Sequence, residues 1–168
     1  CVTIHTSFEL QPTLQLPDEI TTIPKMLQNI STLIVDEISM VRSDLLDAVD
    51  MTLRKYRRND RPFGGVQLLM IGDAQQLSPV VKDSERQYMS QVYPSPYFFH
   101  SKALSRLPYI TIELQKVYRQ KDAEFLEILN AVREDRMTAP LLQKINRRVG
   151  ITPTVSEDGT EPIRLTTH

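Results

Sequence analysis

The chain has 168 residues, of which 40% are hydrophobic and 24% charged, which is ordinary usage for a globular domain. A formal net charge of −1 excludes a uniformly basic nucleic-acid-binding protein, so any contact with nucleic acid must be local. Cys1 is the only cysteine, which excludes an internal disulfide framework and a cysteine-based zinc site and favours a reducing, cytoplasmic compartment. No apolar run is long enough to span a membrane.

Two short apolar runs predict buried strands, residues 32–35 and residues 66–71. Between them, apolar side chains recur at helical spacing from Leu45 to Tyr56, and Ser43 is the expected N-cap of that helix. Residues 74–96 are rich in loop-forming residues and prolines. Residues 109–114 predict a third strand, and residues 124–132 and 141–149 predict two more helices. A polar linker is expected at 152–161, and a further strand is expected to begin at 163.

Continuous apolar strands that alternate with helices predict an α/β fold, in which a parallel sheet carries helices on both faces. In such sheets, ligands bind at the carboxyl ends of the strands. Two acidic signals follow the first two predicted strands directly, Asp36-Glu37 and Asp73. The sequence therefore predicts a functional site where these two strands end.

The pair Asp36-Glu37 has the residue types of a nucleotide-hydrolysing site. One carboxylate at such a site helps to hold magnesium, and a second polarises the attacking water. A solvated acidic turn at a strand end is the alternative interpretation. The four apolar residues before Asp36 and Ser39 after Glu37 make the two interpretations about equally well supported.

Residues 72–79 form a second motif, Gly-Asp-Ala-Gln-Gln-Leu-Ser-Pro, after the second strand. We expect Gly72 to permit a sharp turn and Pro79 to stiffen the exit. A neutral amide such as that of Gln76 can hydrogen-bond a γ-phosphate, or the water that attacks it, without adding charge. The alternative is an ordinary strand-to-loop turn.

Arg119 lies in a third motif, residues 114–120, just after the third predicted strand. An arginine at a domain edge can reach a phosphate and stabilise the transition state of its transfer. A surface arginine that pairs with Glu113 or Asp122 is the alternative, and composition alone favours it.

These three segments, in this order, resemble motifs II, III and IV of superfamily-1 helicases in the RecD/Pif branch. Residues 3–8 resemble motif Ia of that family, residues 96–103 its aromatic block before motif IV, and residues 163–168 the first strand of its second motor domain. The resemblance implies a RecA-like motor domain of the P-loop NTPase class.

The resemblance also implies roles for single residues and names the ligands as ATP and Mg²⁺. Asp36 would hold magnesium, through water, and Glu37 would be the catalytic base. Gln76 would sense the γ-phosphate, and Arg119 would be the arginine finger. Single-stranded DNA would lie near four further residues: His5, Phe8, Pro79 and Val80.

Two departures from the family pattern are visible. Ser78 stands where the family has the first of two prolines, which puts the rigidity of that loop in doubt. No G-x-x-x-x-G-K-[ST] phosphate-binding loop occurs in the 168 residues, and motifs V and VI are absent as well. The resemblance places the loop upstream and the two motifs downstream. We therefore expect a fragment that, alone, binds ATP poorly and hydrolyses it negligibly.

The expected organisation is an incomplete first motor domain at 1–120, a connecting helical segment at 121–150, and a linker with the start of the second motor domain at 151–168. The parent protein would be an ATP-dependent DNA helicase that moves on single-stranded DNA, probes duplex junctions and unwinds them, 5′ to 3′ by resemblance. DNA repair, recombination and replication all use this branch. The alternatives are a non-catalytic helicase-like module that binds nucleic acid, and another P-loop ATPase such as a clamp-loader-like machine.

Two other clusters have competing interpretations. The basic residues between Arg54 and Arg61 could contact DNA phosphates, but the cation-favouring end of a helix explains them better. The aromatic run at 97–99 could stack on bases, but packing is favoured, because three consecutive aromatic side chains cannot all face one groove.

Overall fold

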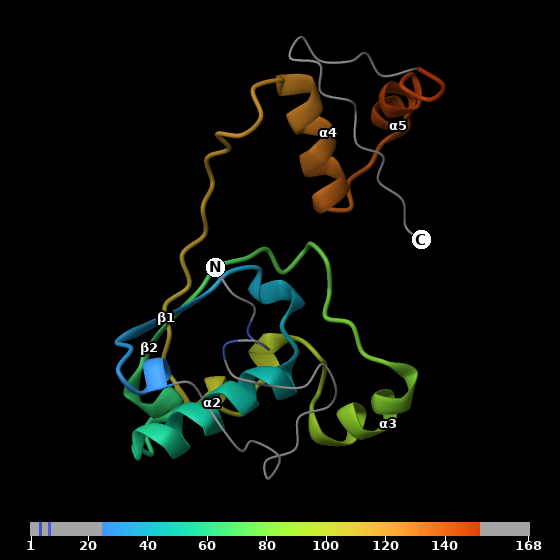
Figure 1. Ribbon diagram of the computed structural model, residues 1–168. Coiled ribbons are helices and arrows are strands. Elements are labelled where there is room, and N and C mark those ends of the chain that lie inside the picture. The colour runs from blue at the N-terminus through green and yellow to red at the C-terminus, as the bar shows by residue number, and fades with distance from the viewer. Residues whose placement is uncertain (1–3, 5–6, 8–24, 152–168) are drawn as a thin grey trace. The chain divides into compact units, whose positions relative to one another are not determined.

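A computed structural model of the chain describes residues 4, 7 and 25–151. The chain divides into two compact units, Cys1–Ile112 and Glu113–His168. Figure 1 shows β1, β2, α2 and α3 in the first unit and α4 and α5 in the second. The predicted linker at 152–161 and the predicted strand at 163 lie outside the described residues.

The first unit contains a parallel pair of strands, β1 (Thr32–Val35) and β2 (Gln67–Met70). Thr32 pairs with Gln67 and Val35 with Met70, so both strands end at the same edge. Both predicted strands are confirmed, the second shorter by one residue at each end. Side chains alternate between the faces: the core receives Leu33, Val35, Leu68 and Met70. On the other face, Ile34 and Leu69 are 60% and 47% exposed.

Helix α2 (Ser43–Arg57) forms the crossover between the strands, together with the short 3₁₀ helices η2 (Ile38–Met40) and η3 (Pro62–Gly65). Its first eight residues are all buried, and Leu46 and Leu53 are fully inaccessible. Replacing either leucine with alanine would cost about 2–5 kcal/mol of folding free energy, through lost burial and the cavity left behind. This helix is therefore the centre of the hydrophobic core.

The expected N-cap of α2 was wrong by one residue, because Arg42 and not Ser43 occupies that position. The Ser43 amide donates to the carbonyl of Pro96 at 2.9 Å, and its hydroxyl donates to the carbonyl of Ser95 at 3.3 Å. A contact with a distant loop therefore uses the Ser43 hydroxyl, whose oxygen would be the capping acceptor if Ser43 were the N-cap.

Sequence reasoning missed one helix, α3 (Asp83–Val92), in the region expected to be loop. Only Glu85 and Met89 of this helix are buried, so it has no broad apolar face for periodicity to detect. Three more 3₁₀ helices lie in this unit: η1 (Lys25–Gln28), η4 (Phe98–His100) and η5 (Leu104–Arg106).

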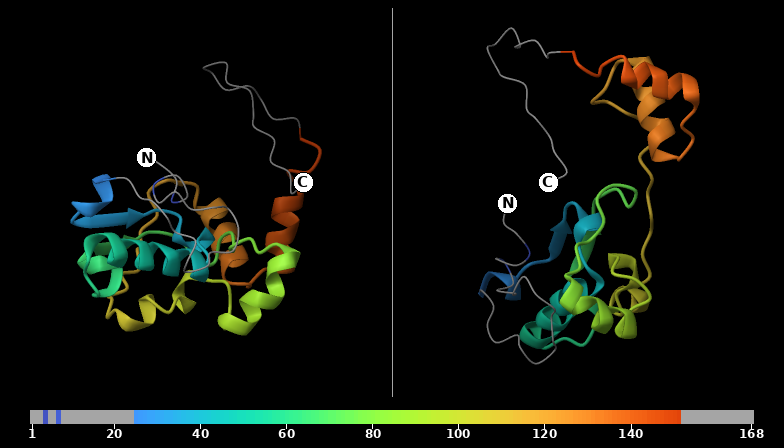
Figure 2. Two further views of the ribbon diagram at one scale, coloured as in Figure 1. Left: turned by 60° about the horizontal axis from the view of Figure 1, so that its bottom comes forward. Right: turned by 90° about the vertical axis from the view of Figure 1, so that its right-hand side faces the viewer.

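The predicted third strand at 109–114 was wrong. No residue from 107 to 122 is in a helix or strand, and Figure 2 shows this segment as a plain thread. Its apolar side chains are open to solvent: Ile110 is 90% exposed, Ile112 79% and Leu114 88%. The alternation typical of a strand is present, but no described strand pairs with the segment, and unpaired backbone groups gain nothing from extension.

The second unit contains α4 (Ala123–Arg133) and α5 (Ala139–Asn146). Both helices were predicted, although α5 begins and ends earlier than expected. Asp122 caps α4 by accepting hydrogen bonds from the amides of Glu124 and Phe125 at 3.0 and 3.1 Å. Lys144 of α5 reaches Glu124 at 3.0 Å, and this hydrogen bond raises the pKa of Lys144. Within the described part of the chain, no helix is long and apolar enough to cross a membrane.

Candidate functional site

The loops that follow β1 and β2 lie side by side. The amide of Ile71 donates to the carbonyl of Val35 at 2.9 Å, and the amide of Ile38 donates to the carbonyl of Ile71 at 2.9 Å. These two bonds continue the strand pairing beyond the sheet itself. The structure therefore joins Asp36-Glu37 and Gly72-Asp73 at one edge, as the parallel arrangement predicted.

Glu37 has a strained backbone at the centre of this edge. Its φ and ψ of 53° and 44° lie in the left-handed region, which costs a non-glycine residue about 1–2 kcal/mol. The carboxylate of Asp36 accepts a hydrogen bond from the Glu37 amide at 2.9 Å. The residue after Glu37, Ile38, is buried and anchors the end of the turn. Both acidic side chains are exposed. The strained turn thus presents two carboxylates to solvent from a backbone that is held in place by its contacts.

Gly72 allows the two loops to approach each other closely. A Cβ at this position would lie 2.9 Å from the Ile38 amide nitrogen and 3.0 Å from Ile38 Cγ2. We expected Gly72 to serve a sharp turn, yet its φ lies outside the left-handed region, and close approach is what excludes a side chain here.

Asp73 organises the second loop around Gln76. Its carboxylate accepts a hydrogen bond from the Gln75 amide at 3.0 Å and another from Nε2 of Gln76 at 3.0 Å. The Gln76 amide nitrogen also donates to the Asp73 carbonyl at 3.0 Å. Sequence reasoning noted Asp73 as an acidic signal but gave it no function. Its position three residues before the glutamine is typical of an Asp that bonds its own loop, and could have indicated this role.

The remaining predicted site residues are more scattered. Pro79 is buried, whereas Val80 is 77% exposed. Arg119 is exposed and belongs to the second unit, Glu113–His168. His5 and Phe8 lie outside the described residues.

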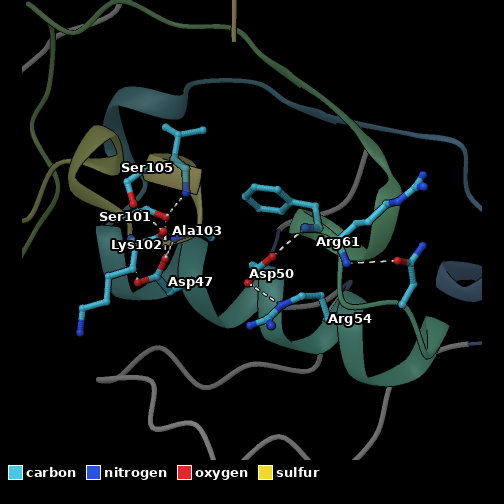
Figure 3. Close-up of polar contacts among 11 residues, drawn as sticks. Asp47, Asp50, Arg54, Arg61, Ser101, Lys102, Ala103 and Ser105 are labelled. Atoms are coloured by element: carbon cyan, nitrogen blue, oxygen red, sulfur yellow. Dashed lines mark hydrogen bonds and ion pairs between the residues drawn. The ribbon is translucent and has the colours of Figure 1, made fainter. Parts of the chain in front are cut away.

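Buried acidic side chains of α2 hold segments that lie later in the chain. Asp47 accepts four hydrogen bonds, from the hydroxyls of Tyr93 and Ser101 and the amides of Lys102 and Ala103, at 2.6 to 3.2 Å. Figure 3 shows Asp47 with Ser101, Lys102 and Ala103, beside the similar cluster at Asp50, which accepts hydrogen bonds from the Phe63 amide and Arg54. These carboxylates have the hydrogen-bond partners that buried charges need, and they tie later segments to the helix that follows Glu37.

Arg42 joins the start of α2 to α3. Its guanidinium donates to Asp44 at 2.6 and 2.9 Å and to Glu85 at 2.6 Å, and the side chain is only 12% exposed. The hydrogen bond to Asp44 raises the pKa of Arg42, while burial opposes that rise. The helix after the first loop is thereby fixed to the helix after the second.

Each of the two clusters with competing interpretations makes contacts within the chain. Arg57 donates to the carbonyls of Gly64, Gln28 and Ile30 at 2.7 to 3.0 Å. Tyr97 and Phe99 stack on each other with ring centroids 5.2 Å apart. Neither observation points to nucleic acid.

The donor set at the strand ends fits magnesium. Among residues 4, 7 and 25–151, no three His, Cys, Asp or Glu side chains come together as a complete metal site. Magnesium rarely uses such a cage, because it keeps water ligands and takes one or two carboxylates together with phosphate oxygens. The exposed carboxylate of Asp36 is a donor of that kind.

Comparison with solved structures identifies the class of fold. The chain superposes with a TM-score of 0.87 on Pif1 helicase from Bacteroides in complex with ADP-AlF3 and ssDNA, at 35% identity, covering 94% of this chain and 38% of that one. A second structure, titled for DNA unwinding at forked dsDNA by two coordinating Pif1 helicases, gives a TM-score of 0.82 at 36% identity, covering 87% of this chain and 37% of the other. The chain therefore has the RecA-like α/β fold of these helicases.

Sequence comparison identifies the family. The profile of the PIF1-like helicase family matches residues 6–143, so the chain belongs to that family. The chain is also 39% identical over 144 residues to the human ATP-dependent DNA helicase PIF1. The aligned region covers 83% of this chain and 20% of the relative. It thus spans about a fifth of the length of that relative.

Proposed function

We propose that this chain forms the magnesium-binding and hydrolytic part of an ATP-driven DNA helicase motor. The observation that carries the proposal is the joining of the two loops, which brings the Asp36-Glu37 turn against the Gly72-to-Gln76 loop. The related Bacteroides helicase binds ADP-AlF3 and ssDNA, and we extend nucleotide and single-stranded DNA binding to this chain from that likeness.

Each residue has a distinct task in this proposal. Asp36 holds magnesium through water, and the ion, when bound, neutralises charge between the outer phosphates. Glu37 accepts the proton of the attacking water. Gln76, which Asp73 holds by its Nε2, contacts the γ-phosphate or that water through its remaining amide groups. Arg119 supplies positive charge to the transferred phosphoryl group.

The proposal extends to the whole protein. The residues at 1–120 belong to the first motor domain, those at 121–150 connect it to the second, and 151–168 begin the second. The parent helicase moves 5′ to 3′ on single-stranded DNA and opens duplex junctions, in repair, recombination or replication. His5, Phe8, Pro79 and Val80 lie along the DNA. Its compartment is the cytoplasm of a bacterium, or the nucleus or mitochondrion of a eukaryote.

ATP turnover of the full-length helicase that carries this sequence tests the proposal, with and without single-stranded DNA. We expect DNA to stimulate the wild-type protein, because the loop of Gln76 links the phosphate to the DNA. Gln76→Ala should lower basal turnover, because a contact with the γ-phosphate or the attacking water is lost, and should also lose most of the stimulation by DNA. Gln75→Ala, a change at the neighbouring exposed amide, is the matched control. Wild-type turnover that ignores DNA would contradict the proposal.

A further inference from the structure

A preformed pocket lies in the first unit, between the exit of the Gln76 loop and α3. It has a volume of about 400 Å³, which is within the range of small-molecule sites. Its lining includes Pro79, Arg86, Met89, Ser90, Tyr93 and Pro96. Most of these side chains are apolar and one is a cation.

The walls of this α3 pocket are fixed by contacts elsewhere in the unit. The Tyr93 hydroxyl donates to Asp47 at 2.8 Å, and the Lys102 ammonium lies 5.2 Å from the centre of the Tyr93 ring. The Pro96 carbonyl accepts the Ser43 amide at 2.9 Å, and Met89 is 4% exposed. A pocket with such walls loses little conformational freedom when a ligand enters, which favours binding.

Two polar residues of the pocket, Arg86 and Ser90, lie one turn apart on α3. Arg86 is 72% exposed at its side chain and pairs only weakly, with the equally open Asp83 at 2.9 Å. The Arg86 guanidinium can therefore exchange Asp83 for an anionic ligand at a small cost in free energy. Ser90 is exposed one turn further along the helix. An apolar cavity with one mobile cation beside it suits a flat ring that carries an adjacent anion.

We propose that the α3 pocket receives one nucleobase of single-stranded DNA, with Arg86 beside the neighbouring phosphate. This inference rests on the proposed function, because the pocket begins at Pro79, three residues after Gln76. A nucleotide entering there contacts the segment whose other end faces the γ-phosphate. A peptide would use the apolar walls, but it would leave the cation of Arg86 without a purpose.

Binding of labelled oligothymidine to the full-length helicase tests the proposal, beside an oligonucleotide of equal length that carries abasic sites. Ser90→Phe fills the mouth of the pocket and should raise the Kd for oligothymidine about tenfold, as expected for the loss of one base contact. It should leave the Kd for the abasic strand nearly unchanged. A similar loss on both strands would overturn the proposal, because it would mean that no base is bound there.

Arg86→Ala gives a second, independent result that does not depend on filling the pocket. Loss of one phosphate contact should lower the slope of log K against log salt concentration by about 0.7. Lys82→Ala removes the same charge from the N-cap of α3, outside the pocket lining, and should leave the slope unchanged. If wild-type protein binds oligothymidine and Ser90→Phe and Arg86→Ala both match Lys82→Ala, the pocket proposal fails alone. If wild-type protein does not bind DNA, the proposed function fails with it.

Discussion

At the scale of single residues, Gly72 decides whether the two site loops can meet. Gly72→Ala places a Cβ 2.9 Å from a backbone nitrogen of Ile38, and a backbone atom cannot swing aside as a side-chain tip can. We expect a loss of about 1–3 kcal/mol in folding free energy, measured by urea unfolding, as for other overpacked sites. ATP turnover of the full-length helicase should fall as well.

The exposed Ala74 in the same loop offers a matched control. Ala74→Ser adds one atom to an open position, and both its stability and its turnover should stay close to wild type. Equal effects of the two substitutions would mean that the approach of the loops at Gly72 has no special importance.

Tyr93 predicts a pH dependence of stability. Burial, and then the hydrogen bond to Asp47, raise the pKa of Tyr93 above its ordinary value of 10.0. Because the folded-state pKa is the higher one, the contribution of Tyr93 to stability is fully present below about pH 10. It is lost as pH rises further, since the unfolded chain ionises first.

Ultraviolet titration of tyrosinate checks this prediction. Tyr93→Phe should remove a tyrosine that ionises only with alkaline unfolding. Early ionisation of Tyr93 in the folded protein would show that its contact with Asp47 is not maintained in solution.

At the scale of elements, the ion pairs of Arg42 hold α2 to α3. Arg42 donates to two buried carboxylates, those of Asp44 and Glu85, so losing its charge through Arg42→Ala should cost about 3–5 kcal/mol. Thermal unfolding measures this loss. Arg86→Ala breaks the exposed pair of Arg86 with Asp83 on α3 and should change stability little. If the two variants unfold alike, the tie between α2 and α3 contributes nothing.

The sequence predicted elements whose stability depends on their own pattern. The strands β1 and β2 are short continuous apolar runs, and α4 has a regular apolar stripe with Asp122 before it. Helix α3 was missed because Arg42 and Asp47, distant in sequence, hold it in place. Residues 109–114 have the pattern of a strand, but a pattern cannot supply the neighbouring strand that pairing requires.

The candidate site likewise has features that the sequence could predict and features that it could not. That Asp36 and Asp73 lie at one edge follows from parallel strands, and this could be predicted. Two other features depend on how the loops pack, which strand periodicity does not encode. They are the close approach of Gly72 to Ile38 and the hydrogen bond from Gln76 to Asp73. The roles of Asp36, Glu37, Gln76 and Arg119 stay predictions.

At the scale of the whole molecule, the 168 residues include the proposed hydrolytic residues but no phosphate-binding loop of the kind that such motors need. One edge of the two-stranded parallel pair presents Asp36, Glu37 and Gln76. We therefore assign proton transfer, and not nucleotide affinity, to this part of the proposed helicase.

Comparison of ATP binding with ATP hydrolysis in the full-length helicase, wild type against Glu37→Gln, tests this assignment most directly. The change keeps the size of the side chain and removes only its basicity. We predict that Glu37→Gln binds a fluorescent ATP analogue within a few-fold of wild type and loses about 10²–10⁴-fold in DNA-stimulated turnover. Turnover that stays near the wild-type rate would contradict the account, because Glu37 would then not be the base.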